Sequence, residues 1–91
     1  MQIYRFIVSG KVQGVFYRKF VSQEMMKEQF QGYVKNLKDG TVEMVAAVYD
    51  DDFDRVMQIL RNGSPASSVE NVSYKSIEDA DFVTDGFEIR Y

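Results

Sequence analysis

The chain has 91 residues, of which 45% are hydrophobic and 14% aromatic, with a net charge of −3 and no histidine or cysteine. One domain over residues 1–91 is expected, and the missing residue types exclude cysteine or histidine nucleophiles, Ser-His-Asp triads, Cys/His zinc sites and disulfides. The acidic balance disfavours a nucleic-acid partner. There is neither an apolar leader nor a run near the roughly 18 residues of a membrane span, so a cytoplasmic protein without membrane contact is expected.

Alternating and helical patterns follow one another along the sequence. Residues 3–9 alternate between apolar positions and more polar, solvent-facing positions, as a half-buried strand does. Asp39-Gly40 is a strong tight-turn signal between two strand-like runs, which predicts a hairpin. The predicted strands are residues 3–9, 33–37, 41–48, 69–77 and a short one at 87–91, with loops at 64–68 and 79–86.

Two segments have the apolar spacing of amphipathic helices. The first is residues 19–29, and its apolar stripe consists of Tyr17, Phe20, Val21 and Met25. Gly32 is expected to end this helix. The second opens on residues 50–52, three aspartates that suit capping and the helix dipole better than a metal cluster. Its apolar positions are Phe53, Val56, Met57 and Leu60, and Gly63 suits its C-cap.

The resulting order is β-α-β-β-α-β with a further short C-terminal strand. This is the split βαβ, or ferredoxin-like, α+β arrangement, in which two helices cover one face of an antiparallel sheet. Because this fold supports many activities, the function has to be argued from particular residues.

The most informative segment joins the first strand to the first helix and reads Gly10-Lys11-Val12-Gln13-Gly14-Val15-Phe16-Tyr17-Arg18. A helix N-terminus carries unpaired N–H groups and partial positive charge, so an arginine there is unfavourable unless an anion lies between them. Loop amides, a helix N-terminus and a guanidinium together suit a phosphate-like dianion. An ordinary connection with two flexible glycines is the alternative.

Asn36 is a second candidate because asparagine is disfavoured inside strands. In a split βαβ arrangement the second strand runs parallel to the first. The C-terminal end of the second strand therefore lies at the same end of the sheet as the glycine loop. An amide there can accept a hydrogen bond from water and donate one to an oxyanion. Fraying beside the hairpin is the plainer alternative.

These segments together resemble the acylphosphatase family. Residues 10–18 are similar to its G-x-V-Q-G-V-x-[FY]-R signature, and Gly63-Ser64-Pro65 resembles a later loop of the family. Gly32-Tyr33-Val34-Lys35-Asn36, followed by Asp39-Gly40-Thr41-Val42-Glu43, resembles its second motif. The likeness extends over essentially the whole chain. Many relatives carry glycine in place of Phe16 and a small polar residue in place of Leu37.

The resemblance implies hydrolysis of acyl phosphates to a carboxylate and inorganic phosphate, with no metal, no cofactor and no phosphoenzyme. It implies that the phosphoryl oxygens are bound by the backbone amides of Gly14, Val15, Phe16, Tyr17 and Arg18. The Arg18 side chain would bind the same group, and Asn36 would orient the attacking water. Inorganic phosphate is then expected as product and inhibitor, and the protein is expected to be a monomer.

The chemistry suits a chain without histidine or cysteine. Phosphoryl transfer depends on positioning and charge stabilisation, and a carboxylate leaving group needs no general acid. The base is open, with a phosphate oxygen of the substrate as one candidate. Tyr91 is expected to pack and Lys19 to be solvated.

Other function classes remain as alternatives. A ferredoxin-like module could bind phosphate or a small molecule without catalysis. An RNA-binding version would need exposed aromatic residues on the third strand, and residues 41–48 have none. A role in maturation or carbamoyl transfer is a further alternative, because a similar domain begins some larger hydrogenase-maturation proteins.

Overall fold

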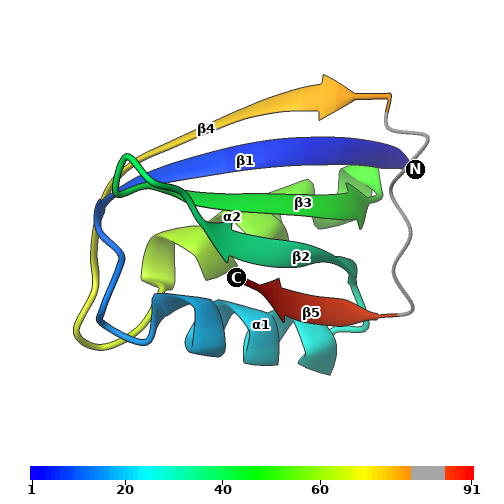
Figure 1. The fold of residues 1–91 in the computed structure, drawn as a ribbon. Coiled ribbons are helices and arrows are strands. Elements are labelled where there is room, and N and C mark those ends of the chain that lie inside the picture. The colour runs from blue at the N-terminus through cyan, green and yellow to red at the C-terminus, as the bar shows by residue number, and fades with distance from the viewer. Residues whose placement is uncertain (79–85) are drawn as a thin grey trace.

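The computed structural model describes residues 1–78 and 86–91 (Figure 1). The expected order of elements is confirmed there, with boundaries shifted by a few residues. The elements are β1 (Gln2–Lys11), α1 (Tyr17–Lys27), β2 (Gln31–Asn36), β3 (Val42–Val48), the 3₁₀ turn η1 (Asp50–Asp52), α2 (Phe53–Asn62), β4 (Ser68–Ile77) and β5 (Phe87–Arg90). The loop expected at 79–86 falls outside the described residues except for Gly86.

The strands within these residues form one sheet in the order β4-β1-β3-β2-β5. β3 lies between β1 and β2 and is antiparallel to both, so β1 and β2 run parallel as the split βαβ arrangement requires. Figure 1 shows α1 and α2 on the same side of this sheet. The ferredoxin-like α+β fold is therefore confirmed.

The expectation of a wholly antiparallel sheet is wrong at β5. This strand pairs in parallel with β2, from Gly32 opposite Phe87 to Lys35 opposite Arg90. β4 is antiparallel to β1 and ends where β1 and β2 begin. A strand that enters the sheet from that end must run in the direction of β2, so the sheet is mixed.

A buried apolar cluster fills the space between the helices and the sheet. Alternate residues of β3 face it, as the sequence predicts, and the helices contribute positions one turn apart. Phe20, expected in the α1 stripe, is 36% exposed, because the buried line of α1 runs through Tyr17, Val21 and Met25 at four-residue spacing. The main members are Phe6, Val8, Val42, Met44, Ala46, Val48, Tyr17, Val21, Met25, Val56 and Leu60.

The first helix ends differently from the prediction. α1 stops at Lys27, and Gln29 takes the left-handed conformation with φ 64°. The Gln29 and Phe30 N–H groups return to the Met26 and Met25 carbonyls, both at 3.0 Å, which is a Schellman cap. Gly32 is instead a β2 residue at a close strand contact. A Cβ there would lie 2.1 Å from the Val45 carbonyl oxygen.

The second helix is confirmed from Phe53 onward and is capped by Gly63. Residues 50–52 form η1 and make no side-chain cap hydrogen bond, so the expected capping role is wrong. Their charges still lie at the positive end of α2. Among the residues described here, no three acidic side chains converge on a metal-sized site. No described helix is long and apolar enough to cross a membrane.

Candidate active site

The loop between β1 and α1 turns on two residues with left-handed backbone. Gly14 has φ 73°, and Phe16 has φ 63° and ψ 22°. Turns of this kind direct successive N–H groups into a shared concavity. Within residues 1–78 and 86–91, the N–H groups of residues 15–18 find no acceptor. The start of α1 therefore presents unpaired donors at the positive end of its dipole.

Two side chains fasten this loop to neighbouring segments. Gln13 Nε2 donates to the Leu37 and Thr41 carbonyls, both at 2.8 Å, and so ties the loop to the β2–β3 turn. From the opposite side, the buried Ser64 donates its hydroxyl proton to the Val15 carbonyl over 2.6 Å. The conformation of the loop is thus fixed by contacts on two sides.

Tyr17, the first residue of α1, anchors the start of that helix on α2. Its ring is buried and its hydroxyl donates to the Leu60 carbonyl over 2.8 Å. Burial raises the pKa of the Tyr17 phenol well above its usual value, so the group stays neutral. Gly63 leaves room for the ring, because a Cβ there would lie 2.8 Å from Tyr17 Cε1.

Arg18 is held by the end of β5. One guanidinium nitrogen, Nη1, donates to the Arg90 carbonyl at 3.0 Å, and the guanidinium carbon lies 4.7 Å from the centre of the Tyr91 ring. A guanidinium has five N–H donors in a fixed plane. The contact with Arg90 uses one of them and orients the rest.

Asn36 is the last residue of β2, opposite Val42 on β3. Its side-chain oxygen Oδ1 is buried and has no hydrogen-bond partner in the described part of the chain. A buried amide oxygen without a partner costs free energy, about 1–3 kcal/mol, and such groups in native proteins call for an explanation. A bound water or ligand would satisfy it.

One pocket brings the predicted residues together except Val15, which is buried and is not among the lining residues. Its volume is about 310 Å³, and both Arg18 and Asn36 line it together with the turn at Gly14 and Phe16. The prediction that the end of β2 lies beside the glycine loop is therefore confirmed in geometry. The full lining is Gly14, Phe16, Tyr17, Arg18, Lys19, Asn36, Ile89 and Tyr91.

The sequence did not reveal what β5 contributes to this pocket. The expectation that Tyr91 packs is wrong, because its side chain is 92% exposed and borders the pocket beside Arg18. Gln13 and Ser64 lay inside recognised motifs, yet no pattern indicated what they would bond. A carbonyl such as that of Arg90 leaves no signal in a sequence, because any residue supplies it.

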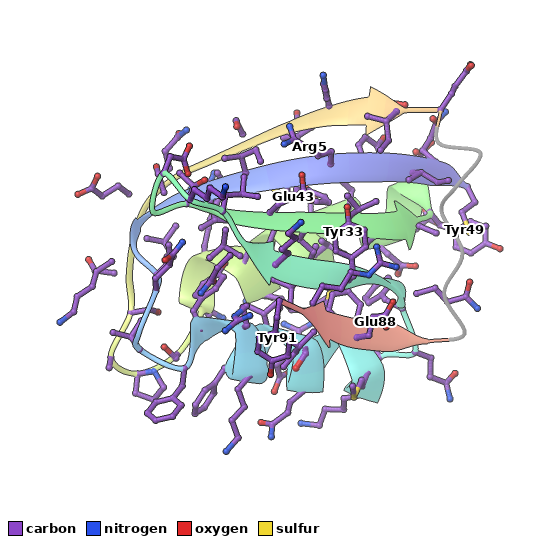
Figure 2. All side chains as sticks on the ribbon, viewed as in Figure 1. Arg5, Tyr33, Glu43, Tyr49, Glu88 and Tyr91 are labelled. Atoms are coloured by element: carbon purple, nitrogen blue, oxygen red, sulfur yellow. The ribbon has the colours of Figure 1, made fainter. Side chains whose placement is uncertain are left out.

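Contacts on the face of the sheet away from the helices hold β5 in place (Figure 2). Arg5 and Tyr33 both bond the Glu43 carboxylate, at 2.7 and 2.9 Å. The Arg90 guanidinium stacks 4.0 Å from the centre of the Tyr33 ring and bonds Glu88 at 2.9 Å. The side chain of Arg90 is therefore fixed on one face, while its carbonyl orients Arg18.

Fold and pocket together define a class of protein. It is a ferredoxin-like α+β domain whose first β–α loop carries unpaired amides and an arginine beside one pocket, with an asparagine whose Oδ1 is buried at the neighbouring strand end. Donors of this kind, with no acidic side chain among the described residues that line the pocket, suit an anionic group.

Comparison with known proteins identifies the family. The Acylphosphatase family model matches residues 4–89. An acylphosphatase of Bacillus licheniformis is 38% identical over 78 residues, which cover 86% of this chain and 87% of the relative. The crystal structure of the Bacillus subtilis acylphosphatase superimposes with a TM-score of 0.89 at 37% identity and covers both chains completely. T. kodakarensis HypF matches with a TM-score of 0.80 at 30% identity, over 98% of this chain but 12% of that chain.

The chain belongs to the acylphosphatase family, a family of hydrolases that act on acyl phosphates. The likeness to HypF concerns a small part of a much longer chain, whereas the match to the acylphosphatases extends over nearly the whole of both proteins. The resemblance drawn from the sequence motifs is therefore confirmed.

Proposed function

We propose that this protein hydrolyses acyl phosphates to a carboxylate and inorganic phosphate without a metal ion or other cofactor. The observation that carries the proposal is the buried Asn36 Oδ1, which has no partner among the described residues and belongs to a residue that lines the same pocket as Arg18 and the loop at Gly14 and Phe16.

The phosphoryl group binds at the start of α1. The backbone N–H groups of Gly14, Val15, Phe16, Tyr17 and Arg18 donate to its oxygens, and the remaining N–H donors of the Arg18 side chain bind the same group. The supporting observations are the unpaired amides of residues 15–18 and the orientation of Arg18 by the Arg90 carbonyl. Lys19, which also lines the pocket, adds positive charge.

Asn36 positions the water. Its Oδ1 accepts a hydrogen bond from the water, and its NH₂ group donates one toward a phosphoryl oxygen. The water oxygen then forms a bond to phosphorus as the bond to the acyl oxygen breaks, and the electron pair of that bond leaves with the carboxylate. A phosphoryl oxygen takes the proton of the water, because no carboxylate side chain or imidazole is among the described residues that line the pocket. The leaving carboxylate is stable at neutral pH and needs no proton.

The first test is hydrolysis of benzoyl phosphate with EDTA present, comparing wild type with Asn36→Ala. We expect metal-independent turnover in the wild type and a kcat about 100-fold lower in the variant, because the water loses its orientation. Asn71→Ala, at an exposed asparagine of β4, is the matched control and retains full turnover. Circular dichroism and thermal unfolding check that both variants fold.

Two outcomes would contradict parts of the proposal. Full turnover in a folded Asn36→Ala variant would remove this residue from the mechanism. A folded wild type without turnover would favour the alternative, a module that binds phosphate or a small molecule without catalysis.

Inorganic phosphate should compete with substrate and stabilise the folded protein. A ligand that binds only the native state raises stability by RT ln(1 + [L]/Kd), which gives about 2.7 kcal/mol at a hundredfold excess over Kd. Steady-state inhibition and differential scanning fluorimetry at increasing phosphate concentrations measure both effects. A chloride salt at equal ionic strength, without sulfate, is the control. No thermal shift at millimolar phosphate would count against the anion site.

A monomeric state and a cytoplasmic location are the remaining proposals. They follow from the small single domain expected from the sequence and from the composition of the chain. Light scattering of the purified protein tests the first, and fractionation of cells that express it tests the second.

A further inference from the structure

Phe16 combines two unfavourable features. Its side chain is 71% exposed, and its backbone has φ 63° and ψ 22°, the left-handed conformation that residues with a Cβ rarely adopt. Glycine at this position would remove both the exposed apolar surface and the strain. Strained residues cluster at functional sites, where the strain holds a group in a required place. The benzyl group of Phe16 is held at the edge of the pocket.

A second exposed aromatic ring borders the same pocket. Tyr91 is 92% exposed and lies beside Arg18, with Ile89 of β5 also lining the space. The guanidinium carbon of Arg18 lies 4.7 Å from the centre of this ring and covers part of it, while most of the ring remains open to solvent. Figure 2 shows Tyr91 just beyond the end of β5, and its ring lies beside Arg18 in the first turn of α1.

The direction of the reaction places the acyl group near these rings. Attacking and leaving oxygens lie roughly in line on opposite sides of phosphorus. In the proposed function the water binds at Asn36, whose Oδ1 is buried. The leaving acyl group then points away from that buried end, toward the exposed side of the pocket where Phe16 and Tyr91 stand.

The size of the pocket agrees with this direction. A water molecule occupies about 30 Å³ in the liquid, so a volume of about 310 Å³ exceeds what a phosphoryl group and one water fill. The remaining space is bordered by the side chains of Phe16, Ile89 and Tyr91, which offer apolar contact and ring faces.

We propose that Phe16 and Tyr91 bind the acyl group of the substrate, so that the enzyme selects acyl phosphates with an aromatic or extended apolar acyl group over acetyl or carbamoyl phosphate. This inference rests on the proposed function and names the substrate class of the same site. Phe16 and Tyr91 are specificity-determining residues in this assignment, and the phosphoryl group is still bound by the loop amides and Arg18.

The test is the ratio of kcat/KM for benzoyl phosphate to kcat/KM for acetyl phosphate, measured in wild type, Phe16→Gly and Tyr91→Ala. Comparing the ratio between variants cancels the different intrinsic reactivity of the two substrates. Loss of one ring contact should lower the ratio roughly 3- to 10-fold. Glycine accepts the backbone conformation of Phe16, so that variant is expected to fold, and Tyr91→Ala provides an independent second site.

Two controls separate ring contact from general damage. Tyr91→Phe keeps the ring and should keep the wild-type ratio. Phe20→Ala removes a partly exposed phenylalanine of α1 that does not line this pocket, and it should also leave the ratio unchanged.

The outcomes distinguish the two proposals. An unchanged ratio in both Phe16→Gly and Tyr91→Ala, with hydrolysis still measurable, would overturn the acyl-group assignment and leave the proposed function standing. Absence of hydrolysis of either substrate by the folded wild type would overturn both. A lower ratio in the two variants, with Tyr91→Phe and Phe20→Ala like wild type, would support the assignment.

Discussion

Arg18 illustrates how a single side chain depends on its surroundings. A cation in the first turn of a helix opposes the helix dipole, yet this one is fixed by the Arg90 carbonyl and the Tyr91 ring. Its orientation is therefore prepared before any anion binds. Preorganised donors stabilise a charged transition state more than flexible ones do, because they need not reorganise during the reaction.

Replacing Arg18 by glutamine should lower kcat/KM for an acyl phosphate by about 10³-fold or more, since the transferring group loses its cationic ligand. The same variant should lose the thermal shift produced by inorganic phosphate, while its own unfolding stays cooperative. Arg61→Gln, at an exposed arginine of α2, is the matched control. Wild-type turnover in a folded Arg18→Gln protein would refute the assignment of Arg18 to the phosphoryl group.

At the scale of single residues, the sequence predicted which side chains lie close together, but it did not predict the backbone conformation of individual residues. Arg18 and Asn36 were predicted as neighbours, and they line one pocket. The left-handed conformation of Phe16 was not predicted, because phenylalanine has no preference for it and only the closed loop imposes it. The same holds for Gln29, which caps α1 where a glycine was expected further along.

Among the elements, the β1–α1 loop owes its shape to segments distant in the sequence. The β2–β3 turn holds it through Gln13, and the residues after α2 hold it through Ser64. These contacts could not be predicted from the local sequence pattern, since they depend on how the β2–β3 hairpin and the 63–67 segment each pack against the loop. The parallel pairing of β5 likewise follows from the sheet order and not from its own residues.

Substituting Ser64 by alanine should both destabilise the protein and disturb the site. The change leaves the buried Val15 carbonyl without its donor, which costs about 1–3 kcal/mol. Because the carbonyl belongs to the loop, KM should rise as the amides lose their alignment. Urea unfolding and steady-state kinetics measure the two effects, with Ser73→Ala at an exposed position of β4 as the control. Unchanged stability and KM in Ser64→Ala would contradict this account of the loop.

For the molecule as a whole, Tyr17 links alkaline pH to stability. The phenol is buried and its pKa is raised in the folded state, whereas the unfolded chain titrates near 10. The folded protein keeps this proton longer than the unfolded chain does. The stability that depends on it is therefore complete below about pH 10 and is lost as the pH rises above that value.

Comparison of wild type with Tyr17→Phe isolates this effect. At pH 8 the variant should be less stable by about 1 kcal/mol, because the Leu60 carbonyl loses its donor. Above pH 10 the difference should shrink, since only the wild type must keep a buried phenol neutral. Urea unfolding at pH 8, 10 and 11 provides the measurement. A gap between the two proteins that stayed constant over this range would show that Tyr17 does not govern alkaline unfolding.

The sheet order has a consequence for how the chain reaches its folded state. β1 is an inner strand, and one of its two neighbours is β4, with Ile3 opposite Ile77 and Lys11 opposite Ser68. Contacts between segments so distant in sequence close large loops before they yield stabilising energy, which slows the search for the native topology. On the ribosome, one edge of β1 stays unpaired until residues 68–77 have emerged. An unpaired apolar strand can meanwhile associate with other chains, so the sheet order exposes this protein to aggregation during its own synthesis.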